Sequence, residues 1–490
     1  MSKAVITLAQ NGSERRLEVN IGDKLPDALR EHGVHIDLPC AGRGTCKGCW
    51  VYINGERRLA CQTVLDGDIR LELTKPGEMT AIATGKDAEP SPGADPFYSR
   101  CGVSVDIGTT TVCANLLDES GKIIGAVTRK NPQTRFGADV ISRIEKSMAG
   151  GDGELAACIR EALSEMIAQL CADASLPLDS VDGLVVTGNT VMLYLLAGQD
   201  PTALSRAPFI ADRLFGETLS ATELGLAIAP SARVYLPRCI SAFVGGDITT
   251  AIMASGMCNL PGNVLLVDIG TNGEIALWRG GELVCCSTAA GPAFEGAGIT
   301  HGVYGVPGAI DRVWTQNGVA RHSTINNLPA VGICGSGIVD ALAVMLELGV
   351  IDETGAFEIG SNIFELEGRV GVTAADVRQV QLAKGSVRAG LETLISSVGV
   401  EKSQIDTLYI AGGFGSYLDM NSAAAIGLIP RELLERVHVI GNAAHTGATM
   451  LLRDKALITA SERLATRART VALDANPVFS ESFMQFMLFE

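Results

Sequence analysis

Four cysteines near the N-terminus of this 490-residue chain have the residue type and spacing of an iron–sulfur site. They follow the pattern C-x5-C-x2-C-x11-C, at the positions Cys40, Cys46, Cys49 and Cys61. Three thiolates on one glycine-rich loop and a fourth from a following strand are what a [2Fe–2S] cluster requires. A tetrahedral zinc site is the alternative, but zinc sites usually combine two C-x2-C pairs, and this segment has one. We therefore expect these four cysteines to bind a [2Fe–2S] cluster.

The second candidate site is a motif that occurs twice, as VSVDIGTTTV at 103–112 and LLVDIGTNGE at 265–274. Each copy places an aspartate after an apolar run and before a glycine. A carboxylate there suits Mg²⁺, which takes one or two carboxylates plus phosphate oxygens, and the amides after the glycine can approach phosphate. We expect Asp106 and Asp268 to be catalytic carboxylates of an ATP site. The expected nucleotide contacts are the residues that follow them: Gly108, Thr109, Thr110, Gly270, Thr271 and Asn272.

A third motif, LYIAGGFGSYLD at 408–419, completes the expected nucleotide site. A strand breaks here into Gly412, Gly413 and Gly415, and backbone without side chains lets an adenine ring and a ribose lie close. A glycine that merely ends a strand would explain one such motif. It does not explain three of them in this order.

Two further glycine-rich loops allow either a functional or a structural interpretation. GICGSGIVDALA at 332–343 enters a helix, where Gly335 and Ser336 would bind phosphate or ribose through N-terminal amides, or would form a helix-packing turn. AAGPAFEGAGITHG at 289–302 contains Glu295, which would position the attacking water or would be a solvated loop acid.

The elements that must position these residues indicate an α/β chain with an additional N-terminal domain. A hairpin, a short helix, the cysteine loop and a closing strand form the first unit, and a Pro- and Gly-rich stretch follows it. Thereafter apolar β-branched runs alternate with helical periods. The expected boundaries are 1–77 for a ferredoxin-like domain, 78–99 for a linker, 100–260 for the first ATPase lobe and 261–490 for the second.

Charge and composition exclude several classes of partner. The formal net charge of −16 argues against binding to nucleic acid or to an anionic membrane. The N-terminus lacks a secretory signal pattern, and no stretch of 18 apolar residues predicts a membrane span. A cysteine cluster in such a chain binds metal more often than it forms disulfides. We therefore expect a cytoplasmic protein.

The motifs resemble two known folds. The cysteine segment, with RLACQ around its last cysteine, resembles the β-grasp [2Fe–2S] ferredoxins, although its first gap is five residues and its last gap is eleven. Residues 101–490 resemble the actin, hexokinase and heat-shock-chaperone superfamily. This resemblance implies two RNase-H-like lobes that close over Mg-ATP.

The combination resembles the ATP-dependent reductive activators of corrinoid proteins, through DIGTTTV, TGNTVML, DIGTNGE, GPAFEGA, CGSG and IAGGFGSYLD in this order. The resemblance implies an ATP-hydrolysing enzyme that reduces the Co(II) of a corrinoid protein to Co(I) through its [2Fe–2S] cluster. The implied partners are a corrinoid protein of a methyltransferase system and an upstream low-potential electron donor, and a homodimer is compatible with it.

Two other functions remain open from the sequence. One is an ATP-dependent electron donor for another low-potential enzyme, as the 2-hydroxyacyl-CoA dehydratase activators are, although those hold a [4Fe–4S] cluster. The other is a small-molecule kinase with a regulatory iron–sulfur cluster. A kinase needs a base at a substrate hydroxyl, and no dedicated substrate loop is evident.

Overall fold

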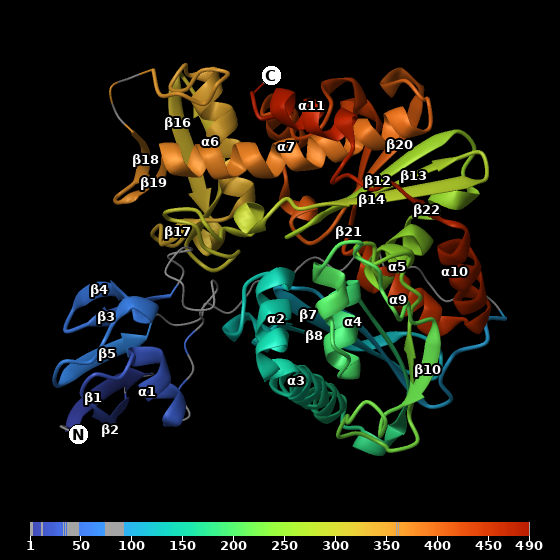
Figure 1. The fold of residues 1–490 in the computed structure, drawn as a ribbon, viewed down its shortest axis with the longest axis horizontal. Coiled ribbons are helices and arrows are strands. Elements are labelled where there is room, and N and C mark those ends of the chain that lie inside the picture. Colours follow the sequence, from blue (N-terminus) through green and yellow to red (C-terminus); the bar gives the residue numbers. More distant parts are fainter. Residues whose placement is uncertain are drawn as a thin grey trace.

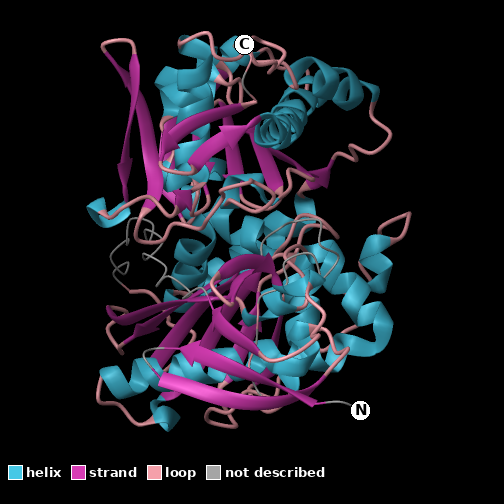
Figure 2. Ribbon diagram, turned by 90° about the vertical axis from the view of Figure 1, so that its left-hand side faces the viewer, coloured by secondary structure: helices cyan, strands magenta, loops and turns pink. Residues whose placement is uncertain are grey.

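A computed structural model describes residues 3–10, 13–32, 34, 36, 49–73, 93–358, 360 and 362–489. Within these residues, one five-stranded and two six-stranded sheets form separate layers, each covered by helices (Figures 1 and 2). Most of the expected linker, and the loop that contains Cys40 and Cys46, lie outside the described residues.

The N-terminal domain is a mixed five-stranded sheet in the order β2-β1-β5-β3-β4. β1 pairs antiparallel with β2 and parallel with β5, so the first and last strands of the domain lie side by side. Its core joins alternate residues of β1, such as Ile6 and Leu8, to Leu29 of α1. The expected hairpin, helix and closing strand are therefore present. Their bounds are β1 Lys3–Gln10, β2 Ser13–Asn20, α1 Leu25–Glu31, β3 Trp50–Ile53, β4 Glu56–Leu59 and β5 Ile69–Leu73.

The first six-stranded sheet has the order β10-β11-β9-β6-β7-β8. β6, β7 and β8 form an antiparallel meander, and β9 and β11 continue the sheet in parallel with β6. The strands are β6 Cys101–Ile107, β7 Thr111–Leu117, β8 Ile123–Lys130, β9 Val181–Gly188, β10 Glu217–Ser220 and β11 Arg233–Leu236. The helices between them are α2 Val140–Lys146, α3 Asp152–Asp173 and α4 Thr190–Ala197.

The second six-stranded sheet has the order β21-β20-β12-β13-β14-β22 and repeats the first over five strands, with its sixth strand, β22, at the opposite edge. Its meander is β12–β13–β14, and β20 and β21 extend it in parallel. Asp106 and Asp268 are each the penultimate residue of the first meander strand, so the sequence repeat is a structural repeat. The strands are β12 Asn263–Ile269, β13 Gly273–Arg279, β14 Glu282–Thr288, β20 Ile405–Ala411, β21 Val437–Gly441 and β22 Arg469–Thr470.

Smaller elements complete the second half of the chain. A three-stranded sheet and a two-stranded hairpin stand beside the second sheet, and α11 packs on the long α7 (Figure 1). The strands are β15 Ala309–Gln316, β16 Val319–Thr324, β17 Gly332–Ile333, β18 Ile363–Glu367 and β19 Val370–Thr373. The helices are α6 Gly335–Glu347, α7 Ala374–Ser397, α8 Met420–Ala425 and α11 Pro477–Phe486.

A layer of helices joins the two six-stranded sheets. α5 Gly246–Ser255 packs on α9 Ala443–Arg453, and α9 also packs on β6 and β9 of the first sheet. The contact is close because Gly447 has no side chain, since a Cβ there would lie 2.0 Å from the carbonyl oxygen of Thr250. α10 Lys455–Arg467 follows α9. A segment near the C-terminus thus covers the sheet formed early in the chain.

His445 fixes part of this layer. Its ring is 3% exposed, and Nε2 lies 3.2 Å from the carbonyl oxygen of Ser104 on β6, to which it donates in the neutral ring. Burial of the ring lowers the pKa of His445 to about 4. The ring therefore links α9 to β6 in its uncharged form.

We expect His445→Gln to make the free energy of unfolding less sensitive to acid. An unfolded chain takes up a proton at this residue as the pH falls through about 6.5, whereas the folded chain does so only near its own lower pKa, so stability is lost across this interval. Between about pH 7.5 and about pH 5, urea unfolding should show a loss about 2 kcal/mol larger for the natural chain than for the variant. Equal losses would contradict the assignment.

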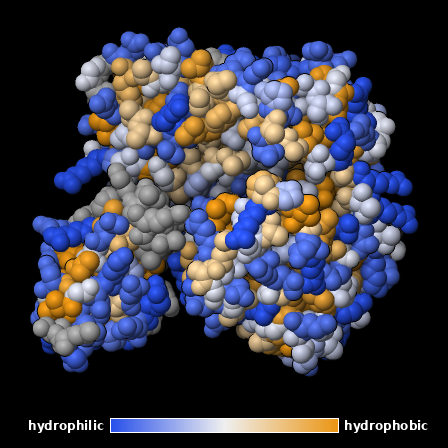
Figure 3. Space-filling model, viewed as in Figure 1, coloured by the Kyte–Doolittle hydropathy of each residue, from blue (hydrophilic) through white to orange (hydrophobic). Residues whose placement is uncertain are grey.

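Hydrophilic side chains are spread over all parts of the face shown in Figure 3. Among the helices of the described residues, none combines the length and the apolar character that crossing a membrane needs.

Candidate functional site

A cavity of about 840 Å³ lies between the two six-stranded sheets and is lined by residues from both halves of the chain. The structure brings nearly all the predicted nucleotide-site residues to it. Those that line the cavity are Asp106, Gly108, Thr109, Thr110, Asp268, Gly270, Thr271, Asn272, Glu295, Gly335, Ser336, Gly412 and Gly413. Gly415 does not line it, because the chain turns at this residue into a short 3-10 helix (Gly415–Tyr417) and packs toward Ile410.

Acidic side chains dominate one part of the cavity. Asp106 and Asp268 end their strands here, and Asp247 of α5 and Glu274 of β13 join them. Burial first, and repulsion from neighbouring carboxylates second, raise the pKa of Asp247 to about 8 and that of Asp268 to about 7. The same two causes raise the pKa of Glu274 well above its ordinary value.

Among the four carboxylates, Asp106 accepts a hydrogen bond that partly offsets the effect of its burial. Burial raises the pKa of Asp106 to about 6, although the side-chain amide of Asn442 donates to its Oδ2 at 3.0 Å and opposes that shift. Four carboxylates held together in this way form a site that a divalent cation would stabilise, because it favours their ionised form.

The donor set suits Mg²⁺ held together with a bound ligand. Within the described residues, no group of three His, Cys, Asp or Glu side chains is arranged to enclose a metal ion. Mg²⁺ does not need such a cage, since it keeps several waters and combines one or two carboxylates with phosphate oxygens. One or two of the carboxylates of Asp106, Asp247 and Asp268 therefore fit Mg²⁺ as part of a Mg–phosphate complex.

The two glycine turns that follow the aspartates have matching geometry. The N–H of Gly108 donates to the carbonyl of Thr111 at 2.9 Å, and the N–H of Gly270 donates to the carbonyl of Asn272 at 3.0 Å. A Cβ on Gly108 would lie 2.7 Å from the carbonyl oxygen of Thr111, so this turn requires glycine. Both turns face the same cavity, as the repeat in the sequence predicts.

Four helices begin at the cavity. Asn189 and Asn442 are the N-caps of α4 and α9, Asp247 is in the first turn of α5, and Gly335 begins α6. The N-terminus of a helix carries a partial positive charge and unpaired N–H groups, so it favours anions. The cavity therefore combines acidic side chains for a cation with helix ends that favour phosphate.

Glu295 connects the two glycine turns. Its carboxylate accepts a hydrogen bond from the hydroxyl of Thr110 in the first loop and another, at 2.7 Å, from the hydroxyl of Thr271 in the second. It lies on a short 3-10 helix, Pro292–Glu295, between β14 and β15. A carboxylate between the two turns can accept hydrogen bonds and orient a water molecule there.

Gly412 lies in the cavity wall next to the acidic group. Its φ is +93°, and a Cβ would lie 2.6 Å from Oδ1 of Asp268, so the strand end can approach only without a side chain. Phe294 and Phe414 stack beside it, with ring centroids 5.1 Å apart.

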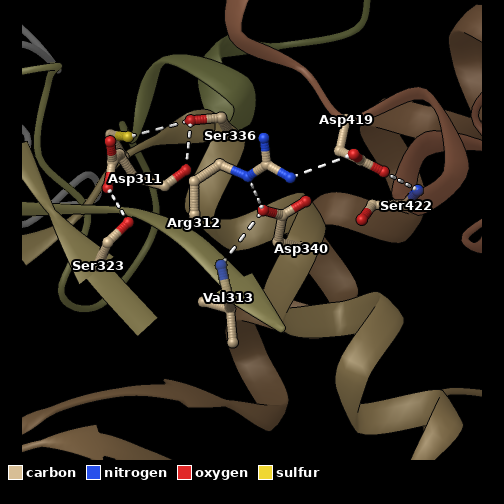
Figure 4. A network of polar contacts seen from close by, with 9 residues as sticks. Asp311, Arg312, Val313, Ser323, Ser336, Asp340, Asp419 and Ser422 are labelled. Atoms are coloured by element: carbon tan, nitrogen blue, oxygen red, sulfur yellow. Dashed lines mark hydrogen bonds and ion pairs between the residues drawn. The ribbon is translucent and has the colours of Figure 1, made fainter. Parts of the chain in front are cut away.

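Arg312 is the one basic side chain lining the cavity within the described residues. Its Nε donates to Oδ2 of Asp340 at 2.8 Å, and its Nη2 donates to Oδ2 of Asp419 at 3.1 Å (Figure 4). Asp340 lies in α6 and Asp419 caps α8, directly after the glycine motif. Two carboxylates thus hold this guanidinium at the wall of the cavity.

Several lining residues were not evident from local patterns. Asp247, Asn442 and Arg312 are far apart in the sequence and lie outside the three nucleotide motifs. Glu274, in contrast, is the last residue of the second Asp-Ile-Gly-Thr segment and was not identified as a site residue. One signal existed for Asp247, because Gly-Gly-Asp before a helical stretch resembles the turns that were identified. Asn189 also lines the cavity, and its side chain donates to the hydroxyl of Thr109 at 3.2 Å.

The described part of the cysteine site lies in the N-terminal domain. Cys49 and Cys61 are 3% and 5% exposed, and the N–H of Cys61 donates to Sγ of Cys49 at 3.4 Å. Cys49 precedes β3, and Cys61 is in a 3-10 helix (Ala60–Gln62) after β4. Two cysteines that are neighbours in space, one of which accepts a hydrogen bond from an amide at its sulfur, fit the ligands of an iron–sulfur cluster. Cys40 and Cys46 lie outside the described residues.

Comparisons with known proteins agree with this arrangement. A family model of the 2Fe-2S iron-sulfur cluster binding domain matches residues 8–68. A model of the RACo middle region matches 101–259, and a model of the C-terminal domain of RACo, the ASKHA domain, matches 262–490. The expected ferredoxin-like domain followed by an actin- and hexokinase-like domain is therefore confirmed.

Two characterised sequences are similar over most of the chain. The corrinoid activation enzyme RamQ of Eubacterium limosum is 34% identical over 80% of this chain and 70% of its own length. The [Co(II) methylated amine-specific corrinoid protein] reductase of Methanosarcina barkeri is 26% identical over 79% of this chain and 76% of its own length.

A solved structure is similar over nearly the whole chain. The reductive activator for corrinoid, iron-sulfur protein superimposes with a TM-score of 0.75 and 26% sequence identity, covering 99% of this chain and 98% of that one. The similarity thus spans the N-terminal domain, the two large sheets and the cavity between them.

Proposed function

Because this chain belongs to the RACo family, in which a [2Fe–2S] domain precedes a middle region and an ASKHA domain, we propose that it is an ATP-dependent reductive activator. Its substrate is a corrinoid protein of a methyltransferase system, whose Co(II) it reduces to Co(I) with an electron from an upstream low-potential donor. One observation carries the proposal: a buried cysteine pair and a two-sided phosphate cavity occur in one chain.

ATP is needed because the electron must move to a lower potential. For one electron, each 59 mV uphill costs about 1.4 kcal/mol, so a gap of a few hundred millivolts costs several kcal/mol. Binding and hydrolysis of ATP can supply this energy only if the nucleotide favours one conformation of the chain over another. A cavity built from two lobes offers such conformations, since closing it changes their relative position.

Different residues of the cavity bind different parts of the nucleotide. The amides of the loops that start at Gly108 and Gly270, with the four helix ends, bind the phosphates. One or two of the carboxylates of Asp106, Asp247 and Asp268 would hold Mg²⁺, which when bound neutralises phosphate charge. The backbone at Gly412, with Arg312 beside it, receives the adenosine.

Glu295 has two tasks in this proposal. It orients the attacking water, since its carboxylate lies between the hydroxyls of Thr110 and Thr271. It also joins the loops of the two lobes while no phosphate separates them. A bound triphosphate competes for the same hydroxyls, so the contact between the lobes depends on the nucleotide.

In the N-terminal domain, Cys40, Cys46, Cys49 and Cys61 hold the [2Fe–2S] cluster. When bound, the cluster supplies one-electron transfer. The low exposure of Cys49 and Cys61 keeps water away from the ligand sulfurs, and the amide of Cys61 favours a charged sulfur on Cys49.

The proposal is tested with the full chain, a Co(II) corrinoid protein and a limiting reductant. The Co(I) absorption band should grow at least about tenfold faster with Mg-ATP than without nucleotide or with a non-hydrolysable analogue, which corresponds to a barrier to reduction that is lower by at least about 1.4 kcal/mol when ATP is turned over. Equal rates in all three conditions would show that the electron transfer is not coupled to ATP.

A further inference from the structure

The first phosphate loop, residues 108–111, has all four of its carbonyls held by donors of the same lobe. The side-chain amide of Asn131 donates to the carbonyl of residue 108 at 2.8 Å, and the N–H of Asn131 donates to that of residue 110 at 2.7 Å. Arg143 donates to the carbonyl of residue 109 through Nη2. The loop's own first N–H donates to the carbonyl of residue 111.

This pattern determines where the amides point. In a trans peptide the N–H of one residue points opposite to the carbonyl of the residue before it. With the carbonyls of Gly108 and Thr109 directed at Asn131 and Arg143, the N–H groups of Thr109 and Thr110 point the other way. Neither N–H has an acceptor within the described residues, and both threonines line the cavity. Two free amides side by side make an anion-binding concavity.

Arg143 is an unusual residue to find behind such a loop. It is fully buried, at 0% exposure. Its remaining partners are uncharged: Nε donates to the carbonyl of Gly137 at 3.1 Å, and Nη1 lies 3.4 Å from Oε1 of Gln133 and 3.1 Å from Sδ of Met192. In the described part of the chain, no carboxylate forms an ion pair with it.

The guanidinium stays charged and its field reaches the cavity. Burial lowers the pKa of Arg143 to about 10, whereas the charges of Asp139 and Glu295 raise it in part. At neutral pH the group is therefore a cation. The influence of Glu295 is informative, because that carboxylate lies in the cavity on the far side of the loop. A buried charge without a paired counter-ion is costly, and an anion bound at the loop would reduce this cost.

We propose that Arg143 is a positioning residue for the triphosphate of the nucleotide. Through the carbonyl of Thr109 it keeps the loop amides turned to the cavity, and its charge, confined in a region of low dielectric, favours phosphate at that loop. The inference rests on the proposed ATP-dependent function and assigns the first loop, rather than the second, as the more strongly anion-binding one.

The second loop supports this distinction. The turn from Gly270 to Asn272 has no arginine or lysine among the hydrogen-bond donors that the described residues provide to it. It lies next to Glu274, which is 8% exposed. A carboxylate beside the second loop opposes the binding of an anion there, so we expect the first loop to bind phosphate more strongly than the second.

The test compares the affinities of the full-length chain for a non-hydrolysable ATP analogue and for adenosine, measured by calorimetry. Arg143→Met removes the charge and keeps an unbranched apolar chain. Its affinity for the analogue should fall about 10- to 100-fold, the range for lost charge-assisted interactions, and its affinity for adenosine should change less than about threefold. Arg143→Lys keeps the charge and should recover part of the loss.

Two further variants complete the design. Gln133→Glu leaves Arg143 in place but sets a carboxylate beside its Nη1, which neutralises its charge. This variant should lower the affinity for the ATP analogue about as much as Arg143→Met does. It replaces Arg143→Met as the test if Arg143→Met does not fold. Arg160→Met is the matched control, because Arg160 also donates to a backbone carbonyl, that of Leu196, and does not line the cavity. It should leave both affinities unchanged.

The outcomes distinguish a failure of the role of Arg143 from a failure of the proposed ATP-dependent function. If the natural chain binds the analogue and Arg143→Met and Gln133→Glu bind it equally well, the role of Arg143 is refuted while the ATP-dependent function stands. An equal loss for adenosine and for the analogue would also refute it, because that result indicates a merely structural role. If the natural chain binds neither, the proposed function fails first.

Discussion

Asp268→Asn is expected to reduce ATP hydrolysis at least about 1000-fold, because it removes an oxygen ligand where charge must be neutralised during phosphoryl transfer. The residue is the penultimate one of β12, lines the cavity and is repelled by the carboxylate of Asp106. An asparagine keeps the size of the side chain and loses its charge. Colorimetric phosphate release with the corrinoid protein present is the measurement.

The same substitution should stabilise the chain in the absence of nucleotide. Burial and the charge of Asp106 raise the pKa of Asp268 to about 7, so its ionised form is disfavoured in the folded state. Removing that charge should increase the free energy of unfolding by about 1–3 kcal/mol above neutral pH. Loss of activity together with a gain in stability distinguishes a functional carboxylate from a structural one.

Asp173→Asn serves as the control for Asp268→Asn, since Asp173 is exposed at the end of α3. It should change neither the ATPase rate nor the stability by a measurable amount. Full ATPase activity in Asp268→Asn would overturn the assignment of the cavity to ATP hydrolysis. The visible spectrum of the iron–sulfur cluster should be the same in both variants.

Cys61→Ala is expected to abolish the cluster and, with it, the reduction of Co(II), by a factor of at least about 100. The side chain is buried next to Cys49, and alanine offers no ligand in its place. The natural chain should be red-brown and contain two irons and two sulfides, as a [2Fe–2S] centre does. Iron analysis, visible absorption and the growth of the Co(I) band are the three measurements.

The ATP analogue should still bind to Cys61→Ala, because the cavity lies between the other two sheets. Cys258→Ala is the control, since Cys258 is a partly buried cysteine beside the second sheet. It should keep both the colour and the activity. A colourless natural chain with one zinc ion would contradict the redox function and would favour the zinc interpretation of the cysteine spacing.

The parts of the site that could be predicted from sequence are those whose residues are consecutive. The cysteine spacing, the two Asp-Ile-Gly-Thr turns and the glycine motif at 408–419 each lie within one short stretch, so local backbone geometry relates their residues directly. The repeat of the turns predicted two similar halves, and the two sheets share the same order over five of their six strands.

The N-terminal domain was predictable for the same reason. Its hairpin, helix and closing strand are short elements with clear periods, and the first strand alternates buried and exposed residues. The positions of Cys40 and Cys46 relative to the two described cysteines stay a prediction, as do the domain boundaries and the nucleotide contacts.

Other features of the site depend on residues that only the fold brings together. Asp247, Asn442 and Arg312 reach the cavity from three different segments, and α9 covers the first sheet although it lies near the C-terminus. In contrast, Gly415 belongs to the glycine motif and was predicted to contact the nucleotide, but it packs toward Ile410 and does not line the cavity.

The sequence by itself determined which residue types the site contains and in which order the chain presents them. The tertiary structure decided their charges and their orientation. The pKa values of Asp247 and Asp268 rise because packing removes water and brings carboxylates together, and Arg143 acts on the first loop because helix α2 places it behind Thr109. Burial and distance between segments are properties of the packed chain, and local sequence does not contain them.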